Sequence, residues 1–267
     1  MKKLDDSRFI DGIFNYCDRW CERCSFTSRC RLYATEQQDE DLDDPATRDI
    51  NSEAFWNKLA SIFKETHEMI ATMAAEQGID LEALDLEAAG KREDRRRAKS
   101  ERHPLSRSAE QYAKLVNEWF NREYPEKEQE RDADLCRGDL TLVDFDAQDR
   151  ASSIHDAMEV IRWYQFQIAV KIMRGLMGDE PEEDTIDFVA AARQKDSDGS
   201  AKVALIGMER SLSAWGRLRE LVPEKSASIL SMMLHLEQLR RGTEQAFPAA
   251  NSFVRPGFDE ASDEFVS

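Results

Sequence analysis

The sequence lacks a long apolar run, and the longest good one covers only residues 203–208. A helix that crosses a membrane needs roughly 18 or more mostly apolar residues, so we expect no such segment. The first residues, Met-Lys-Lys-Leu-Asp-Asp, lead into acidic side chains rather than into the apolar stretch of a secretory signal. A cytoplasmic protein is therefore expected.

Positive charge is in short supply. The chain has 37 Lys and Arg residues against 54 Asp and Glu residues, which gives a net charge of −17. A protein that binds nucleic acids in general meets the phosphate backbone with net positive charge, so this acidity argues against that class. Hydrophobic residues still make up 41% of the chain and include thirteen Phe, which excludes wholesale disorder.

Glycine and proline are scarce, with eleven Gly and seven Pro, and they separate long segments in which apolar residues recur every three or four positions. Only residues 140–145 resemble a strand, so a βαβ fold is excluded. The periodicity predicts an all-α, up-and-down bundle of five or six long helices. The helices are expected at residues 7–33, 52–75, 108–125, 152–177, 200–221 and 224–241, the last two forming a hairpin at the Val222-Pro223 break.

This pattern predicts four segments in sequence order. They are a Cys-rich metal-binding helix and turn packed on the bundle (1–35), an acidic linker (36–51), the helical bundle (52–246) and an acidic, irregular tail (247–267).

Cysteine is concentrated in one segment, where Cys17, Cys21, Cys24 and Cys30 fall within fourteen residues, and Cys136 stands alone. A disulfide framework is not expected in a long cytoplasmic chain whose cysteines share one corner. Offsets of 0, 4 and 7 place the first three on one stripe of a helix. A turn after Cys24 would bring in Cys30, so the spacing predicts four converging thiolates.

Four thiolates in an apolar setting bind a soft metal. Zinc sites usually use two C-x2-C turns, and this segment has a single C-x2-C turn. A four-iron cluster spreads its thiolates over separate corners, which suits ligands along a helix face. The leading hypothesis is therefore a four-Cys iron–sulfur (4Fe-4S) cluster for electron transfer or redox sensing, with a redox or protein partner. The alternatives are a structural zinc site in a protein-interaction module, and ordinary or redox-switching thiols.

The C-x3-C-x2-C part of the motif, residues 17–24, is similar in spacing to that of radical-SAM enzymes. In that family the three cysteines follow a strand of a βα barrel and leave one iron open for the cofactor. Here the preceding segment is expected to be helical, a fourth cysteine follows closely, and no βα alternation appears. We therefore do not expect radical-SAM chemistry.

Several polar residues on the expected helices offer a second site. A di-iron or other metalloenzyme site inside the bundle could use His67, His155, Glu159, Glu209 and His235. The Glu-x-x-His signature of di-iron bundles is absent, which favours hydrogen-bonded or partly exposed side chains instead.

Two further features have ordinary interpretations. Cys136 is expected to be a small loop or core residue, and otherwise a fifth ligand or redox partner of the cluster. Residues 91–102 carry seven Lys or Arg against three acids. They are expected to form a solvated helix or linker. The alternative is contact with an acidic partner or with nucleic acid, against which no aromatic residues interleave there to stack on bases.

Overall fold

The computed structural model describes residues 8–41, 45–76, 78–83, 85–125, 145–178 and 187–259. All regular elements in these ranges are α-helices or 3-10 helices, with no strand among them, so the predicted all-α fold class is confirmed. The strand-like residues 140–144 lie outside the described ranges. The chain divides into two compact units, Met1–Phe14 with Trp20–Asp94, and Asn15–Arg19 with Arg95–Ser267.

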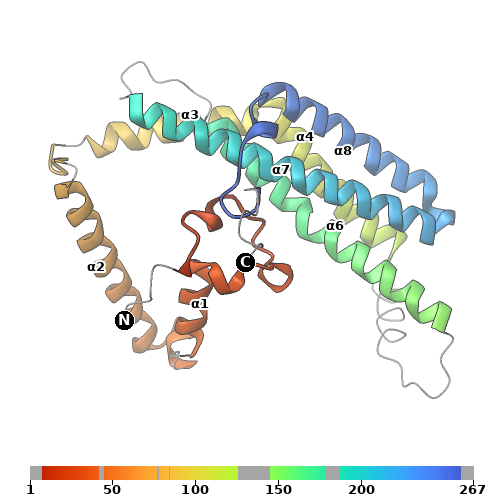
Figure 1. The fold of residues 1–267 in the computed structure, drawn as a ribbon, viewed down its shortest axis with the longest axis horizontal. Coiled ribbons are helices and arrows are strands. Elements are labelled where there is room, and N and C mark those ends of the chain that lie inside the picture. The colour runs from red at the N-terminus through yellow and green to blue at the C-terminus, as the bar shows by residue number, and fades with distance from the viewer. Residues whose placement is uncertain are drawn as a thin grey trace, which may run out of the picture. The chain divides into compact units, whose positions relative to one another are not determined.

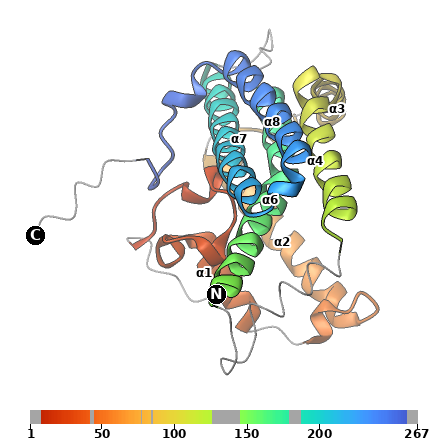
Figure 2. The same ribbon diagram turned by 90° about the vertical axis from the view of Figure 1, so that its right-hand side faces the viewer.

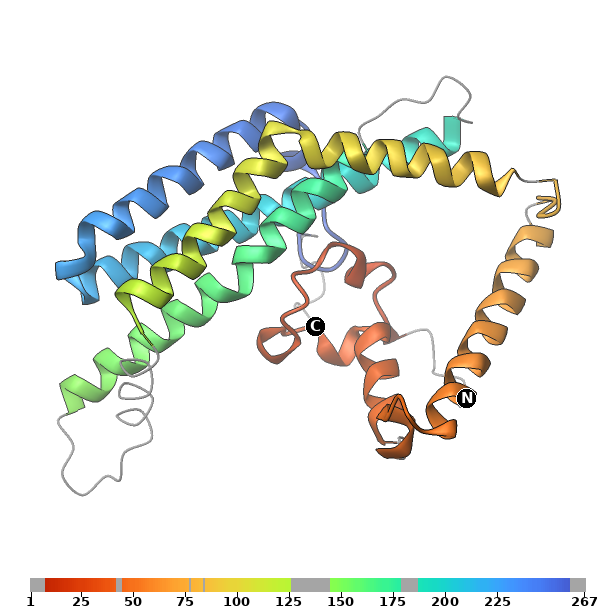
Figure 3. The ribbon, with the colours of Figure 1, turned by 180° about the vertical axis from the view of Figure 1, so that it is seen from behind.

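In its described residues, the second unit contains an up-and-down bundle of four helices. Helices α4 (Pro104–Glu123), α6 (Phe145–Gly178), α7 (Asp187–Leu221) and α8 (Ser226–Ala246) follow one another around it, and α8 also packs on α4 (Figure 1). Consecutive helices run in opposite directions, as the view from behind also shows (Figure 3). The Ser197 hydroxyl near the start of α7 donates to the Gly175 carbonyl near the end of α6 at 2.8 Å, which fixes this antiparallel pair.

The bundle buries the apolar stripes that the sequence pattern predicts. Buried residues of α6 recur at spacings of three, four or seven positions: Ile154, Met158, Ile161, Ile168 and Ile172. An aromatic cluster lies where α4 meets α7. The Trp215 indole is in edge contact with Trp119, with ring centroids 4.9 Å apart, and its Nε1 donates to the Tyr112 hydroxyl at 2.9 Å.

The predicted hairpin between the last two helices is confirmed. Helix α7 ends at Leu221, and Pro223 begins a single 3-10 turn, η6 (Pro223–Lys225), before α8. Proline cannot continue a helix but suits its first turn, which is why the chain reverses here.

Proline also marks the start of α4, directly after α3 (Leu86–Arg102). The His103 ring nitrogen Nδ1 accepts from the Leu105 backbone at 3.2 Å, and Pro104 occupies the first helical position. Side-chain capping satisfies one of the free N–H groups of a helix start. The view turned by 90° shows the resulting bend between the two helices (Figure 2).

The first unit contains α1 (Arg31–Asp41), the turn η5 (Pro45–Arg48) and α2 (Glu53–Glu76). Helix α1 therefore extends into residues that the sequence analysis assigned to an acidic linker. Helix α2 is confirmed, but its apolar stripe is not covered as expected. Phe55 and Leu59 are half-buried, whereas Ile62, Met69 and Met73 are exposed.

Six helices of 17 residues or more occur in the described ranges, which agrees with the predicted five or six. Only four of them make the bundle of the second unit. In these ranges no helix combines the length and the apolar character needed to cross a membrane. After α8 the chain forms one 3-10 turn, η7 (Ala250–Ser252), within the part of the tail that is described.

Acid pH is expected to weaken α8. Hydrogen bonds from Arg240 and Arg241 lower the pKa of the Glu237 carboxyl from 4.5 to about 2. Because the folded-state pKa lies below the unfolded one, this pairing stabilises the fold above about pH 4.5 and is lost as the pH falls towards 2. The pair is at the surface, so Glu237→Gln should cost only about 0.5–1 kcal/mol near neutral pH and almost nothing near pH 2.

Urea unfolding at several pH values checks this prediction. Glu220→Gln is the matched control, since Glu220 accepts from Arg217 and both side chains are exposed on α7. A Glu237→Gln deficit that does not shrink with falling pH would rule out the electrostatic explanation.

Candidate metal centre

The Cys-rich segment is not a continuous helix, so that prediction is wrong. From residue 8 onward it contains the short 3-10 helices η2 (Ile13–Tyr16), η3 (Cys21–Arg23) and η4 (Thr27–Arg29), and α1 begins only after Cys30. A shared helical stripe of thiols therefore does not exist.

The helix expected from the sequence is broken at Asp18 and Arg19. The backbone carbonyl of Asp18 accepts hydrogen bonds from the side chains of Trp163 and Gln167, which compete for it with the backbone N–H groups of a continuing helix. Arg19 adopts a left-handed backbone with φ of 57°. That conformation costs a residue other than glycine roughly 1–2 kcal/mol and does not occur inside a right-handed helix.

Cys21 and Cys24 flank a tight turn. The Cys24 backbone N–H donates to the Cys21 carbonyl at 3.2 Å, which closes η3. The backbone N–H of Phe26 then donates to the Cys24 Sγ at 3.4 Å. A backbone donor aimed at a sulfur stabilises negative charge there, and hydrogen bonds of this kind also set the potential of sulfur-ligated clusters.

Cys30 follows the second turn of the first unit. Its N–H donates to the Thr27 carbonyl at 3.2 Å, and its own carbonyl accepts from Ala34 at 3.1 Å as α1 begins. A backbone hydrogen bond of 3.0 Å from Ile10 to the Arg29 carbonyl joins the two ends of the segment. The guanidinium of Arg23 lies 4.3 Å from the centre of the Trp20 ring, so a cation and an aromatic ring stand beside these turns.

Cys17 belongs to the second unit. Its thiol is half-buried, and burial raises the pKa of that thiol above its ordinary value. A hydrogen bond with the Arg19 backbone and the charge of Lys171 on α6 oppose this effect. In the metal-free protein Cys17 is therefore held mainly as the neutral thiol, and a bound metal would have to displace its proton.

The four thiols are chemically suited to a soft metal but are not shown to converge. Cys17, Cys21, Cys24 and Cys30 are all half-buried, and none is in a disulfide. Within the described ranges, however, no three Cys, His, Asp or Glu side chains are grouped closely enough to hold a metal ion. The metal centre therefore stays a prediction, and the helix-face argument that favoured a cluster over zinc no longer applies.

The histidines and carboxylates of the second predicted site form no metal-binding group of three within the described ranges. His155 and Glu159 form an exposed pair on α6 with 3.8 Å between Nε2 and Oε1, and Glu209 is exposed on α7. His235 is half-buried, and its Nε2 lies 2.9 Å from the Ser108 carbonyl. His67 is exposed on α2 of the first unit. The described geometry gives these residues ordinary surface or hydrogen-bonding roles, and a di-iron site among them stays a prediction.

Cys136 lies outside the described residues. The basic run at residues 91–102 falls in α3 and is mostly exposed, as predicted for a solvated helix, and Arg97 pairs with Glu101 at 3.4 Å.

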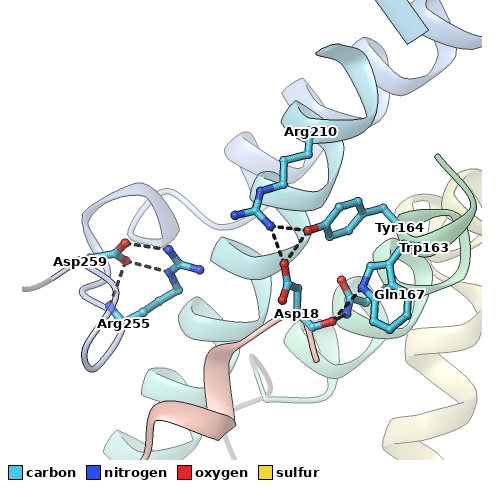
Figure 4. A network of polar contacts seen from close by, with 7 residues as sticks. All are labelled: Asp18, Trp163, Tyr164, Gln167, Arg210, Arg255 and Asp259. Carbon is cyan, nitrogen blue, oxygen red and sulfur yellow. Dashed lines mark hydrogen bonds and ion pairs between the residues drawn. The ribbon is translucent and has the colours of Figure 1, made fainter. Parts of the chain in front are cut away.

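Sequence reasoning missed the polar network around Asp18. The Asp18 carboxylate accepts from the Tyr164 hydroxyl and from Arg210, each at 2.5 Å, while its carbonyl accepts from two further side chains of α6 (Figure 4). The sequence did contain a sign of this network, because side chains with hydrogen-bonding groups recur along one side of α6 among the apolar core positions. They are Trp163, Tyr164, Gln167, Lys171 and Arg174.

The arrangement can supply sulfur ligands, a backbone donor to one of them, and nearby cations. Such a donor set fits thiophilic metals and leaves hard cations such as Mg²⁺ without their preferred oxygen ligands. No protein-family model, no curated protein and no solved structure matches this chain.

Proposed function

We propose that the chain binds an iron–sulfur cluster through Cys17, Cys21, Cys24 and Cys30, for electron transfer or redox sensing. The observation that carries the proposal is the hydrogen bond from the Phe26 backbone to the Cys24 Sγ, directly after the Cys21–Cys24 turn. Backbone N–H groups that donate to cysteine sulfur stabilise the thiolate state that a cluster needs. Cys17 is included among the proposed ligands only because of its spacing from the other cysteines in the sequence.

The proposed ligand set favours electron transfer over substrate chemistry. Four protein thiolates would occupy all four irons of a 4Fe-4S cluster and leave no open position. Four arginines of the segment would offset the negative charge of the ligated cluster: Arg19, Arg23, Arg29 and Arg31. The proposal also places the protein in the reducing cytoplasm, where thiols stay free, and implies a redox partner.

A structural zinc site is the second candidate, and one observation favours it. The Cys21–Cys24 pair forms a tight 3-10 turn rather than part of a helix. Paired cysteines on such C-x2-C turns are the usual ligands of structural zinc. The segment has only one C-x2-C pair, which is why the cluster remains the first proposal.

An absorption spectrum with metal and acid-labile sulfide analysis separates the two. The protein is purified without oxygen, because clusters are oxidised in air. Broad visible absorbance with bound iron and sulfide would support the cluster. A colourless protein with one zinc would support the structural site, and a protein with neither metal would overturn both.

Removing a cysteine of the segment is expected to abolish metal binding. Cys21→Ala and Cys24→Ala should each lower the bound metal by about tenfold or more, because each removes one of four ligands. Cys136→Ala is the matched control and should keep its metal. Metal content, measured by elemental analysis per protein chain, decides the question. Unchanged metal in both variants of the Cys21–Cys24 turn would disprove the assignment.

A further inference from the structure

The short segment Tyr16–Asp18 lies along one side of α6. Asp18 contacts Trp163, Tyr164 and Gln167, whereas Tyr16 lies near the other end of the helix, where Arg174 and Asp196 influence its pKa. The segment therefore runs antiparallel to α6, with Cys17 in between and within the electrostatic reach of Lys171. All these residues belong to the second unit.

Asp18 is fixed on two sides. Its carbonyl oxygen accepts from the Trp163 Nε1 at 3.0 Å and from the Gln167 amide at 2.5 Å. Its carboxylate accepts from the Tyr164 hydroxyl and from the Arg210 guanidinium of α7 (Figure 4). Arg210 also donates to the Tyr164 hydroxyl, so the three side chains form one closed set. A residue held through both its backbone and its side chain cannot rotate away without breaking several bonds at once.

Tyr16 fixes the other end of the segment. Its side chain is buried, and its ring meets the Phe253 ring edge-on, with centroids 4.7 Å apart. The ring lies directly over Gly199 of α7, where a larger residue would have no room. Cys17 thus stands between two anchored neighbours.

We propose that Asp18, held by Tyr164 and Arg210, is a positioning residue that keeps the thiol of Cys17 in a fixed, half-buried place against α6. The inference deepens the proposed function, because it gives one of the four ligands a preformed position before any metal binds. A ligand that is already ordered loses less conformational entropy on binding. The same anchorage shields Cys17 from reagents in solution.

The reactivity of each cysteine in the metal-free full-length protein tests the inference. The protein is treated with iodoacetamide at a fixed pH, and the alkylation rate of every cysteine is followed by mass spectrometry. The variants are Asp18→Asn, Tyr164→Phe, Arg210→Ala and Arg210→Lys. Arg217→Ala is the matched control, since Arg217 lies further along α7 and pairs with the exposed Glu220.

Positioning and simple electrostatics predict different patterns. If Asp18 positions Cys17, then Asp18→Asn, Tyr164→Phe and Arg210→Ala should each speed the alkylation of Cys17 by about tenfold, because each loosens the segment. Arg210→Lys should restore most of the shielding, and Arg217→Ala should change nothing. The Cys21, Cys24 and Cys30 rates should stay within about twofold throughout.

A purely electrostatic effect would instead speed Asp18→Asn, slow Arg210→Ala and leave Tyr164→Phe unchanged, and this pattern would overturn the inference. The inference would also be overturned if Cys17 were alkylated as fast in the wild-type protein as in the variants. The metal-loaded protein supplies a second measurement, because Tyr164→Phe should shift its absorption spectrum while the metal content is retained. If the wild type holds no metal, the proposed function fails, whereas the alkylation pattern still decides whether Asp18 positions Cys17.

Discussion

Replacing Trp215 with Ala is expected to lower the free energy of unfolding by about 3–5 kcal/mol, the usual cost of removing a large aromatic residue from a core. Trp215 is fully buried in α7, and its ring is in contact with Trp119 and Phe120 of α4. The neighbouring helices cannot close the space that the indole leaves. Urea unfolding followed by circular dichroism measures the loss.

Trp215→Phe separates the hydrogen bond from the packing. It keeps most of the ring but removes the Nε1 donor, which leaves the buried Tyr112 hydroxyl without that bond. This change should cost about 1–3 kcal/mol beyond the small change in volume. The double variant with Tyr112→Phe removes both partners and should be more stable than the sum of the single losses predicts.

Trp56→Ala is the control for the aromatic substitution itself. Trp56 is 54% exposed on α2, although its Nε1 donates to the Ile50 carbonyl at 2.9 Å. We expect a loss below about 1 kcal/mol there. Equal losses for Trp215→Ala and Trp56→Ala would contradict the assignment of the Trp215 cluster to the core of the bundle.

The bundle was predictable because its signals are local and agree with one another. Apolar residues of α6 recur with helical spacing, and Pro223 stops one helix where the next begins. Each of these features acts within a few residues of the chain. A pattern of this kind identifies helices and hairpins without knowledge of what packs against them.

The Cys-rich segment was not predictable in the same way. Its apolar and thiol spacing is helical, but the segment folds into separate turns because side chains about 145 residues away capture the Asp18 carbonyl. Helix propensity cannot anticipate side-chain donors from a distant part of the chain that compete for a backbone carbonyl. The same limit applies to α2, whose stripe predicts burial but leaves Ile62 and Met69 exposed, since periodicity does not name the surface that covers it.

Gly199→Ala is expected to destabilise the second unit by about 2 kcal/mol and to release the segment that carries Cys17. A Cβ at this position of α7 would lie 2.8 Å from the Phe253 Cζ and still closer to the Tyr16 ring. Both rings would have to move, and overpacking of this kind costs roughly 1–3 kcal/mol. The better helix propensity of alanine returns only about 1 kcal/mol or less.

Gly216→Ala makes the same chemical change in the same helix without the crowding. Among the described residues its Cβ would meet the Met233 Cε alone, at an ordinary 3.9 Å. This variant should therefore gain about 0.5–1 kcal/mol from propensity alone. Urea unfolding gives both values, and iodoacetamide labelling should show faster alkylation of Cys17 only in Gly199→Ala. If both variants gain stability and Cys17 stays shielded in both, then Tyr16 is not seated on Gly199, and the anchorage of Cys17 depends on Asp18 alone.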